Sequence, residues 1–189
     1  WQKAVDDGMN VMTVEEAAEK ADIIHILLPD ETQEKVYAEQ IAPYVESGNT
    51  ISFSHGYNIH FGLIEPPEDV NIIMFAPKGP GSRVRQTYKE GFGIPGLVAI
   101  ERDATGDAFD IAIEMAKAGN KTLIVECDLR RPTQGNLFKV RPKKGLTKYL
   151  SGDCTLEEAA AVTTTENLYF LDVDSKVVNP VEMLGSERF

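Results

Sequence analysis

The sequence predicts an α/β fold in which a mostly parallel sheet lies between two layers of helices. First, strand and helix patterns alternate along the 189 residues, which is typical of βαβ units. Second, residues 22–28 form a nearly continuous apolar run, as in strands buried on both faces of a parallel sheet. Third, the runs at 51–54 and 72–76 break into loops of glycine and small polar residues, as expected at the carboxyl ends of such strands. We therefore expect residues 1–189 to form a single domain, a Rossmann-like three-layer sandwich.

Local signals set the limits of each expected element. Residues 13–16 (Thr-Val-Glu-Glu) match a capping box at a helix start. Residues 107–118 place Ile111, Met115 and Ala118 on one apolar stripe of an amphipathic helix. The expected helices are 1–8, one after Thr13, one from the turn at 29–33 to about Val45, 59–64, 82–90, 107–118, 134–139, 145–150, 156–161 and one from 181 onward. The expected strands are 10–12, 22–28, 50–54, 71–76, 97–101, 122–125 and 167–173.

Composition excludes several classes of protein. Lys+Arg 19 against Asp+Glu 30 gives a net charge of -11, which argues against a nucleic-acid partner because phosphate contacts need a basic face. No apolar run approaches the roughly 20 residues of a membrane span, so we expect no membrane partner. Cys127 and Cys154 form neither a disulfide framework nor a metal spacing, and a cytoplasmic setting is expected. The start at Trp1 has no signal peptide and resembles a cut edge.

Two strand-to-loop switches between residues 54 and 83 make this stretch the candidate site. One apolar run gives way to His55-Gly56, and the next gives way to residues 78–81 (Lys-Gly-Pro-Gly). Glycine lets the backbone approach a ligand closely, and a following helix start offers N–H groups to an anion. Histidine titrates near neutrality and is the usual acid–base group. These loops predict a site for a small nucleotide or anion; the alternative is two ordinary βα turns that need glycine for their shape.

Residues 1–118 resemble the NADPH-binding domain of ketol-acid reductoisomerases, enzymes of branched-chain amino-acid synthesis. The resemblance lies in VMTVEEAAEKADIIHILLPDETQ, SHGYNIHFG and VNIIMFAPKGPGSRVRQTYKEGFGIPGLVAIERDATGDA. It implies that NADP(H) is the cofactor. It also implies that Asp30, Glu31, Thr32 and Gln33 line the cofactor site, that His55 is the active-site histidine, and that Lys78 and Gly81 lie by the nicotinamide end. Gly79, between them in the same loop, is a further cofactor-binding candidate.

Parts of that family's machinery are not found in the sequence. Its glycine-rich dinucleotide loop would lie before Trp1, and its magnesium carboxylates belong to a helical domain that we expect this chain to lack. A GxGxxG string does occur at residues 91–96, but it follows an expected helix and precedes an expected strand, the reverse of the dinucleotide fingerprint. Without two metal ions the alkyl migration of the family has no evident driver.

Residues 111–189 resemble the cytoplasmic kinase domain of bacterial capsular and exopolysaccharide tyrosine kinases. The matching segments are MAKAGNKTLIVECDLRRPTQGNLF, KGLTKYLSGDCTLEEA, TENLYFL and NPVEMLGSERF. The resemblance implies an acidic element at a strand end in which Asp128 and Arg130 match and Glu126 replaces an aspartate, and which holds Mg²⁺ and ATP. The alternative for Asp128 is a helix cap and a surface ion pair. No G-x-x-x-x-G-K-[ST] phosphate loop exists in the chain, so ATP and Mg²⁺ binding is not expected.

Because the two resemblances meet within 107–118, we interpret the chain as an engineered chimera of Rossmann-like and P-loop-like pieces. This interpretation predicts no intact catalytic site, a vestigial His55, and at most weak nucleotide or anion binding. One alternative is an NADP(H)-binding oxidoreductase fragment of the reductoisomerase type. The other is an ATP- and Mg²⁺-binding kinase-like module using Asp128 and Arg130.

The chimera interpretation makes a prediction about the sheet. A strand at 122–126 or 168–173 should pair with one of the strands at 23–28, 51–54 and 72–76. Otherwise the apolar run at 22–28 would be exposed at a sheet edge, where it would favour aggregation.

Overall fold

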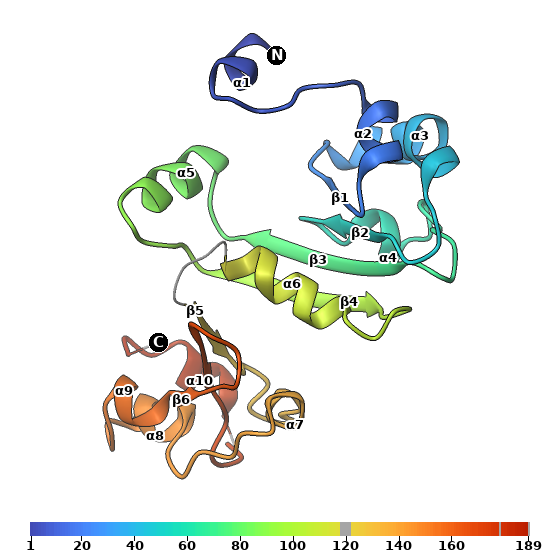
Figure 1. Cartoon of the computed structure of the whole chain (residues 1–189). Coiled ribbons are helices and arrows are strands. Elements are labelled where there is room, and N and C mark those ends of the chain that lie inside the picture. The colour runs from blue at the N-terminus through green and yellow to red at the C-terminus, as the bar shows by residue number, and fades with distance from the viewer. Residues whose placement is uncertain (118–121, 178, 189) are drawn as a thin grey trace. The chain divides into compact units, whose positions relative to one another are not determined.

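The computed structural model describes residues 1–117, 122–177 and 179–188. The chain divides into two compact units, Trp1–Ala118 and Gly119–Phe189 (Figure 1). That residues 1–189 form a single domain stays a prediction. Ala118, the end of the expected apolar stripe, lies outside the described residues.

A four-stranded sheet organises the first unit. Its order is β1-β2-β3-β4, with β1 parallel to β2, β2 parallel to β3, and β3 antiparallel to β4. Ile51 lies beside Ile24 on one side and Ile72 on the other, so the apolar runs are in register. The mostly parallel, Rossmann-like α/β sheet is therefore confirmed. The strands are β1 (Ile23–Ile26), β2 (Thr50–Phe53), β3 (Asn71–Pro77) and β4 (Gly96–Arg102).

Helices follow each parallel strand of the first unit. Thr13 caps α2 as predicted, because its hydroxyl accepts from the Glu16 amide while the Glu16 carboxylate accepts from the Thr13 amide. The helices are α1 (Gln2–Asp6), α2 (Val14–Lys20), α3 (Asp30–Val36), the π-helical turn η1 (Tyr37–Ile41), the 3₁₀ turn η2 (Ala42–Tyr44), α4 (Tyr57–His60), α5 (Gly81–Lys89) and α6 (Ala108–Lys117).

The central strands β2 and β3 are covered on both faces of the sheet, which makes the three layers. On one face, Ile72 packs with residues of α2, η1 and the neighbouring strands; on the other, Ile73 packs with Ala108 and Ala112 of α6. Figure 1 shows α6 running along β3 and β4. Because Ile72 and Ile73 are adjacent, they point to opposite faces of the sheet, and an uninterrupted apolar run is what this strand requires.

Three expected elements of the first unit differ from the structure. Residues 10–12 are not a strand, and in the described residues no strand pairs with them. The helix expected at 59–64 is Tyr57–His60. The single helix expected to reach Val45 is instead α3, η1 and η2. Pro43 explains the change, because it has no amide hydrogen and its ring clashes with the carbonyl four residues earlier in an α-helix.

The second unit has its own small sheet, in the order β5-β7-β6. β5 is parallel to β7, and β6 is antiparallel to it. Leu129, Leu146, Leu150 and Leu171 form the centre of its core. The elements are β5 (Thr122–Val125), β6 (Ala161–Val162), β7 (Leu168–Leu171), α7 (Gln134–Phe138), α8 (Leu146–Ser151), α9 (Leu156–Ala159) and α10 (Pro180–Leu184).

The predicted pairing of strand 122–126 or 168–173 with the first sheet is wrong. β5 and β7 pair with each other, from Thr122 beside Leu168 to Val125 beside Leu171, within the sheet of the second unit. In the first sheet, β4 pairs with β3, and the two edge strands are β1 and β4. Ile23 is 42% exposed and Leu27 71% exposed at or just after β1, as expected for an unpaired apolar edge. In the described residues no helix is long and apolar enough to cross a bilayer.

Candidate functional site

An open cavity of about 260 Å³ lies at the carboxyl ends of β1 and β2. Ligands of parallel α/β sheets bind at this edge, because the loops there leave backbone and polar side chains free. The loop after β1 leads into α3, and the loop after β2 leads into α4. The cavity is lined by Ile26, Leu27, Leu28, Pro29, Asp30, Gln33, Ser54 and His55.

Hydrogen bonds within the first turn of α3 fix the loop after β1. The Thr32 hydroxyl donates to the Pro29 carbonyl at 2.9 Å. The Gln33 amide nitrogen donates to the Leu28 carbonyl at 2.7 Å and to Asp30 Oδ1 at 3.3 Å. Asp30 also lies in the first helical turn, where a negative charge interacts favourably with the helix dipole. The loop thus presents the Asp30 carboxylate in a defined orientation.

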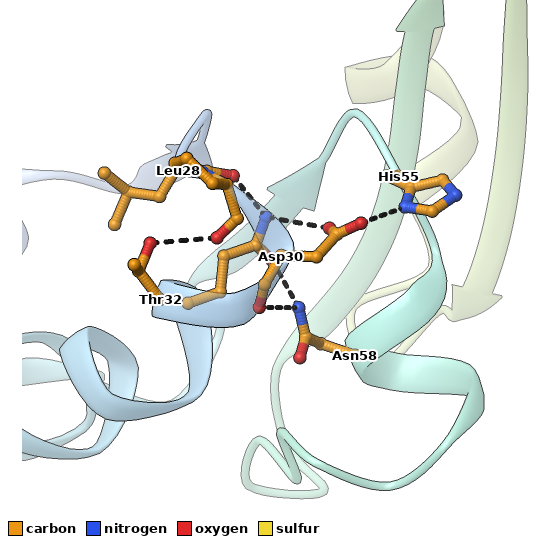
Figure 2. A network of polar contacts seen from close by, with 7 residues as sticks. Leu28, Asp30, Thr32, His55 and Asn58 are labelled. Atoms are coloured by element: carbon orange, nitrogen blue, oxygen red, sulfur yellow. Dashed lines mark hydrogen bonds and ion pairs between the residues drawn. The ribbon is translucent and has the colours of Figure 1, made fainter.

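Asp30 and His55 meet across the two strand ends. His55 Nδ1 lies 2.5 Å from Asp30 Oδ2, with the two side chains 66% and 31% exposed (Figure 2). An ionised carboxylate is only an acceptor, so the shared hydrogen belongs to Nδ1. The other ring nitrogen, Nε2, has no hydrogen-bond partner in the part of the chain that the structure describes. A neutral His55 can therefore accept a proton or a hydrogen bond there.

Asn58, which was not among the predicted site residues, connects α4 to α3 beneath this pair. Its amide nitrogen donates to the Asp30 carbonyl at 3.0 Å and to Gln33 Oε1 at 3.0 Å. Asn58 is 1% exposed and Gln33 is 3% exposed. Figure 2 shows Asn58 facing the start of α3. The only signal in the sequence was an amide side chain within the strand-end loop, since its partners come from another element.

A second histidine lies between the strands. His25 Nδ1 is 2.8 Å from the Ser52 hydroxyl, and its Nε2 is 3.3 Å from the Ser54 hydroxyl. The Ser54 hydroxyl also donates to the Phe75 carbonyl at 2.9 Å. Burial lowers the pKa of His25, because the charged ring loses hydration. His25 therefore has its polar atoms paired with the sheet, in contrast to His55.

The predicted residues after β3 lie outside the cavity lining. Lys78 is exposed, and its backbone amide donates to the Pro95 carbonyl at 2.8 Å. Gly79 packs closely, since an added Cβ would lie 3.1 Å from the Ile94 side chain. Gly81 begins α5, which has no side-chain cap. Glu31 and Thr32 are likewise outside the lining. Of the predicted set, the cavity thus brings together Asp30, Gln33 and His55.

The GxGxxG string at 91–96 has the structural context expected of a decoy. It follows α5 and leads directly into β4, so helix precedes strand. A dinucleotide fingerprint needs a strand before the glycines and a helix after them.

The acidic loop after β5 bonds mainly to its own backbone. Asp128 Oδ1 accepts from the amides of Arg131 at 2.9 Å and Arg130 at 3.0 Å, and these bonds lower the pKa of the Asp128 carboxyl. Glu126, 6% exposed, accepts from the amides of Asp128 and Thr133. Across residues 1–117, 122–177 and 179–188, no three His, Cys, Asp or Glu side chains are grouped to hold a metal ion. Metal binding by Asp128 stays a prediction.

Comparison with known proteins gives one consistent family. Residues 1–122 match the model of the acetohydroxy acid isomeroreductase NADPH-binding domain. The ketol-acid reductoisomerase (NADP(+)) of Methanobrevibacter smithii is 69% identical over 140 residues, and that of Methanosphaera stadtmanae is 64% identical over 140 residues. Each alignment covers 73% of this chain and 42% of the relative, so the chain spans about two fifths of the length of these curated relatives.

Two solved structures resemble parts of this chain. An NADH-preferring ketol-acid reductoisomerase from an uncultured archean is 52% identical with a TM-score of 0.61, over 62% of this chain and 36% of that chain. A semialdehyde dehydrogenase NAD-binding protein from Cupriavidus necator is 21% identical with a TM-score of 0.50, over 61% of this chain and 45% of that chain. At that identity the second likeness shows the fold alone.

These comparisons overturn the interpretation as an engineered chimera without an intact catalytic site. Residues 1–122 match a single natural family, and alignments over 73% of the chain extend beyond residue 118, where the junction was expected. The resemblance of residues 111–189 to bacterial tyrosine kinases is supported neither by the family model nor by these relatives. A helix, a turn and a strand recur in many α/β proteins, so such a connection at residues 107–118 does not indicate a junction between two parents. The comparisons favour the alternative of an NADP(H)-binding oxidoreductase fragment of the reductoisomerase type.

Proposed function

The chain belongs to the acetohydroxy acid isomeroreductase family through its NADPH-binding domain, and we propose that it binds NADP(H) at the carboxyl ends of β1, β2 and β3. In this proposal it is the nucleotide-binding part of a ketol-acid reductoisomerase, the activity named for its relatives. The observation that carries the proposal is the contact between Asp30 and His55, which joins two adjacent strand ends beside an open cavity.

The chemistry of the cavity suits one end of a dinucleotide. The apolar surfaces of Leu27 and Leu28 suit a flat ring, and the Asp30 carboxylate suits ribose hydroxyls. The exposed Lys78 ammonium, just before α5, suits a phosphate. At about 260 Å³ the cavity is below the usual size of about 300–1,000 Å³ for ligand pockets, so only part of the dinucleotide fits in it. The rest would extend along the strand ends toward Gly79 and Gly81.

Each predicted residue has a role in this proposal. Residues 30–33 contact the cofactor from the start of α3, and Lys78 with the two glycines contacts it from the loop before α5. NADPH, when bound, supplies a hydride. His55 holds or accepts a proton at Nε2 beside the reacting atoms, with Asp30 holding its Nδ1. The fold and the family support these roles.

A fluorescence titration with NADPH tests the proposal. We expect saturable binding, weakened about tenfold by Lys78→Ala and by His55→Ala, which corresponds to about 1.4 kcal/mol each. Lys89→Ala is the matched control, because Lys89 is an exposed lysine in the last turn of α5, away from the strand ends. We expect this control to bind like the unmodified chain. Absence of saturable binding, or equal losses in the two lysine variants, would contradict the proposal.

A further inference from the structure

We propose that Gln33 and Asn58 are positioning residues that hold Asp30 so that His55 keeps a proton on Nδ1 and offers Nε2 to the cavity. The part of this inference that concerns the reaction rests on the proposed function. Its structural part concerns the ring of His55 alone and can be measured without NADPH. The residues form one connected set of hydrogen bonds, drawn in Figure 2.

The acceptors around the two amides fix their orientation. The Gln33 nitrogen faces the Leu28 carbonyl and Asp30 Oδ1, while its oxygen faces the Asn58 nitrogen. The Asn58 nitrogen faces the Asp30 carbonyl as well as the Gln33 oxygen. Each amide hydrogen of both side chains therefore has an acceptor. Turning either amide over would place oxygen against oxygen, so the set has one direction.

The chain of hydrogen bonds that begins at Asn58 ends at the imidazole ring of His55. Asn58 holds Gln33 and the Asp30 backbone, Gln33 holds Asp30 Oδ1, and Asp30 Oδ2 accepts from His55 Nδ1. The two amide residues are almost fully buried, whereas Asp30 and His55 are partly exposed at the cavity. A rigid, buried pair thus supports an accessible pair, which is how reactive groups are kept in one geometry.

An asparagine at position 58 lowers the stability of the fold, and packing alone does not require an amide side chain there. Its Oδ1 atom is buried and has no hydrogen-bond partner within the described residues. A buried acceptor without a partner destabilises the folded state, and an apolar residue of similar size would avoid this loss. What an asparagine provides at this position, and an apolar residue would not, is an amide nitrogen that donates to Asp30 and Gln33.

His25 provides an internal reference with the opposite proton position. The Ser54 hydroxyl donates to the Phe75 carbonyl, so it accepts from His25 Nε2, and Nδ1 of that ring accepts from Ser52. We therefore expect neutral His25 to carry its proton on Nε2 and His55 to carry its proton on Nδ1. The chain has 3 histidines, so the ring signals can be assigned by single substitutions.

Nitrogen-15 NMR of the histidine rings at pH 8.5 tests the proposal. The unmodified chain should show a protonated Nδ1 for His55. Asp30→Ala, Gln33→Glu and Asn58→Leu should each move that proton predominantly to Nε2, since the acceptor is removed or displaced. Thr32→Ala is the matched control: it removes a hydrogen bond from the same turn that does not reach Asp30 or Gln33, and should leave the His55 ring unchanged.

The outcomes are distinguishable. A His55 proton on Nε2 in the unmodified chain, or unchanged on Nδ1 in folded Gln33→Glu and Asn58→Leu, overturns the proposal. Loss of folding in both variants also overturns it, because the two residues would then be structural. Failure of NADPH to bind would contradict the proposed function and leave the ring measurement valid.

Discussion

The loops after β1 and β5 both place a carboxylate just beyond a strand of a parallel pair, but the carboxylates have different partners. Asp30 bonds to the side chains of His55 and Gln33, and so joins the loops of two neighbouring strands. Asp128 accepts from backbone amides two and three residues further along its own loop. The first carboxylate orients a histidine beside a cavity, and the second stabilises a turn.

The difference shows what makes a strand-end carboxylate available for chemistry. Backbone amides of a loop must find acceptors when water is excluded. In the second unit, Glu126 and Asp128 supply those acceptors themselves. In the first unit, the Thr32 amide donates to the Pro29 carbonyl, and the Asp30 carboxylate accepts from the side chains of Gln33 and His55. The chemistry depends on whether the carboxylate accepts from the backbone of its own loop or from side chains beside the cavity.

Among the variants that test this comparison, Glu126→Ala should cause the largest loss of stability. It leaves the amides of Asp128 and Thr133 without their carboxylate acceptor, the buried Glu126 side chain. Because hydrogen bonds to charged groups contribute about 1.5–3 kcal/mol each, we expect the second unit to lose about 3 kcal/mol of stability. Amide hydrogen exchange in β5 and β7 measures this, and should become faster by about a hundredfold or more where exchange needs global unfolding.

The control for this experiment is NADPH binding by the first unit, which should stay unchanged in Glu126→Ala. Equal exchange rates in the variant and the unmodified chain would show that the Glu126 carboxylate does not hold its loop. The contrast between the two strand ends would then be lost.

Much of the first unit follows from local sequence, and the rest depends on contacts between distant segments. The capping box at Thr13 and the apolar strands were predicted because their causes lie within a few residues. Asp30 and His55 were predicted from the resemblance, but the role of Asn58 was not, since its partners lie 25 and 28 residues away. The separate sheet of β5 and β7 was missed for the same reason, because local pattern does not determine strand partners.

His25, whose ring nitrogens are hydrogen-bonded to Ser52 and Ser54, should have a smaller effect, on the pH dependence of stability. Burial lowers its pKa, so below about pH 6.5 the unfolded chain binds a proton that the folded chain resists. The first unit should therefore lose stability as the pH falls from 7 to 5. His25→Gln should reduce this loss. Thermal unfolding of both forms across that pH range is the measurement, and equal pH slopes would contradict the contrast between buried His25 and accessible His55.

The smallest effect on stability is expected from Asp128→Asn. This variant tests the comparison at the loop after β5. The amides of Arg131 and Arg130 lower the pKa of Asp128, so its stabilising contribution is present above the pKa of the unfolded chain and is lost as the pH falls through the folded pKa. The variant should be slightly less stable at pH 7, and the difference should shrink in acid below about pH 4. Calorimetric titration with Mg²⁺ supplies the decisive arm: binding that disappears in Asp128→Asn would make Asp128 a metal ligand, and the loop after β5 would then be a functional strand end like the one after β1.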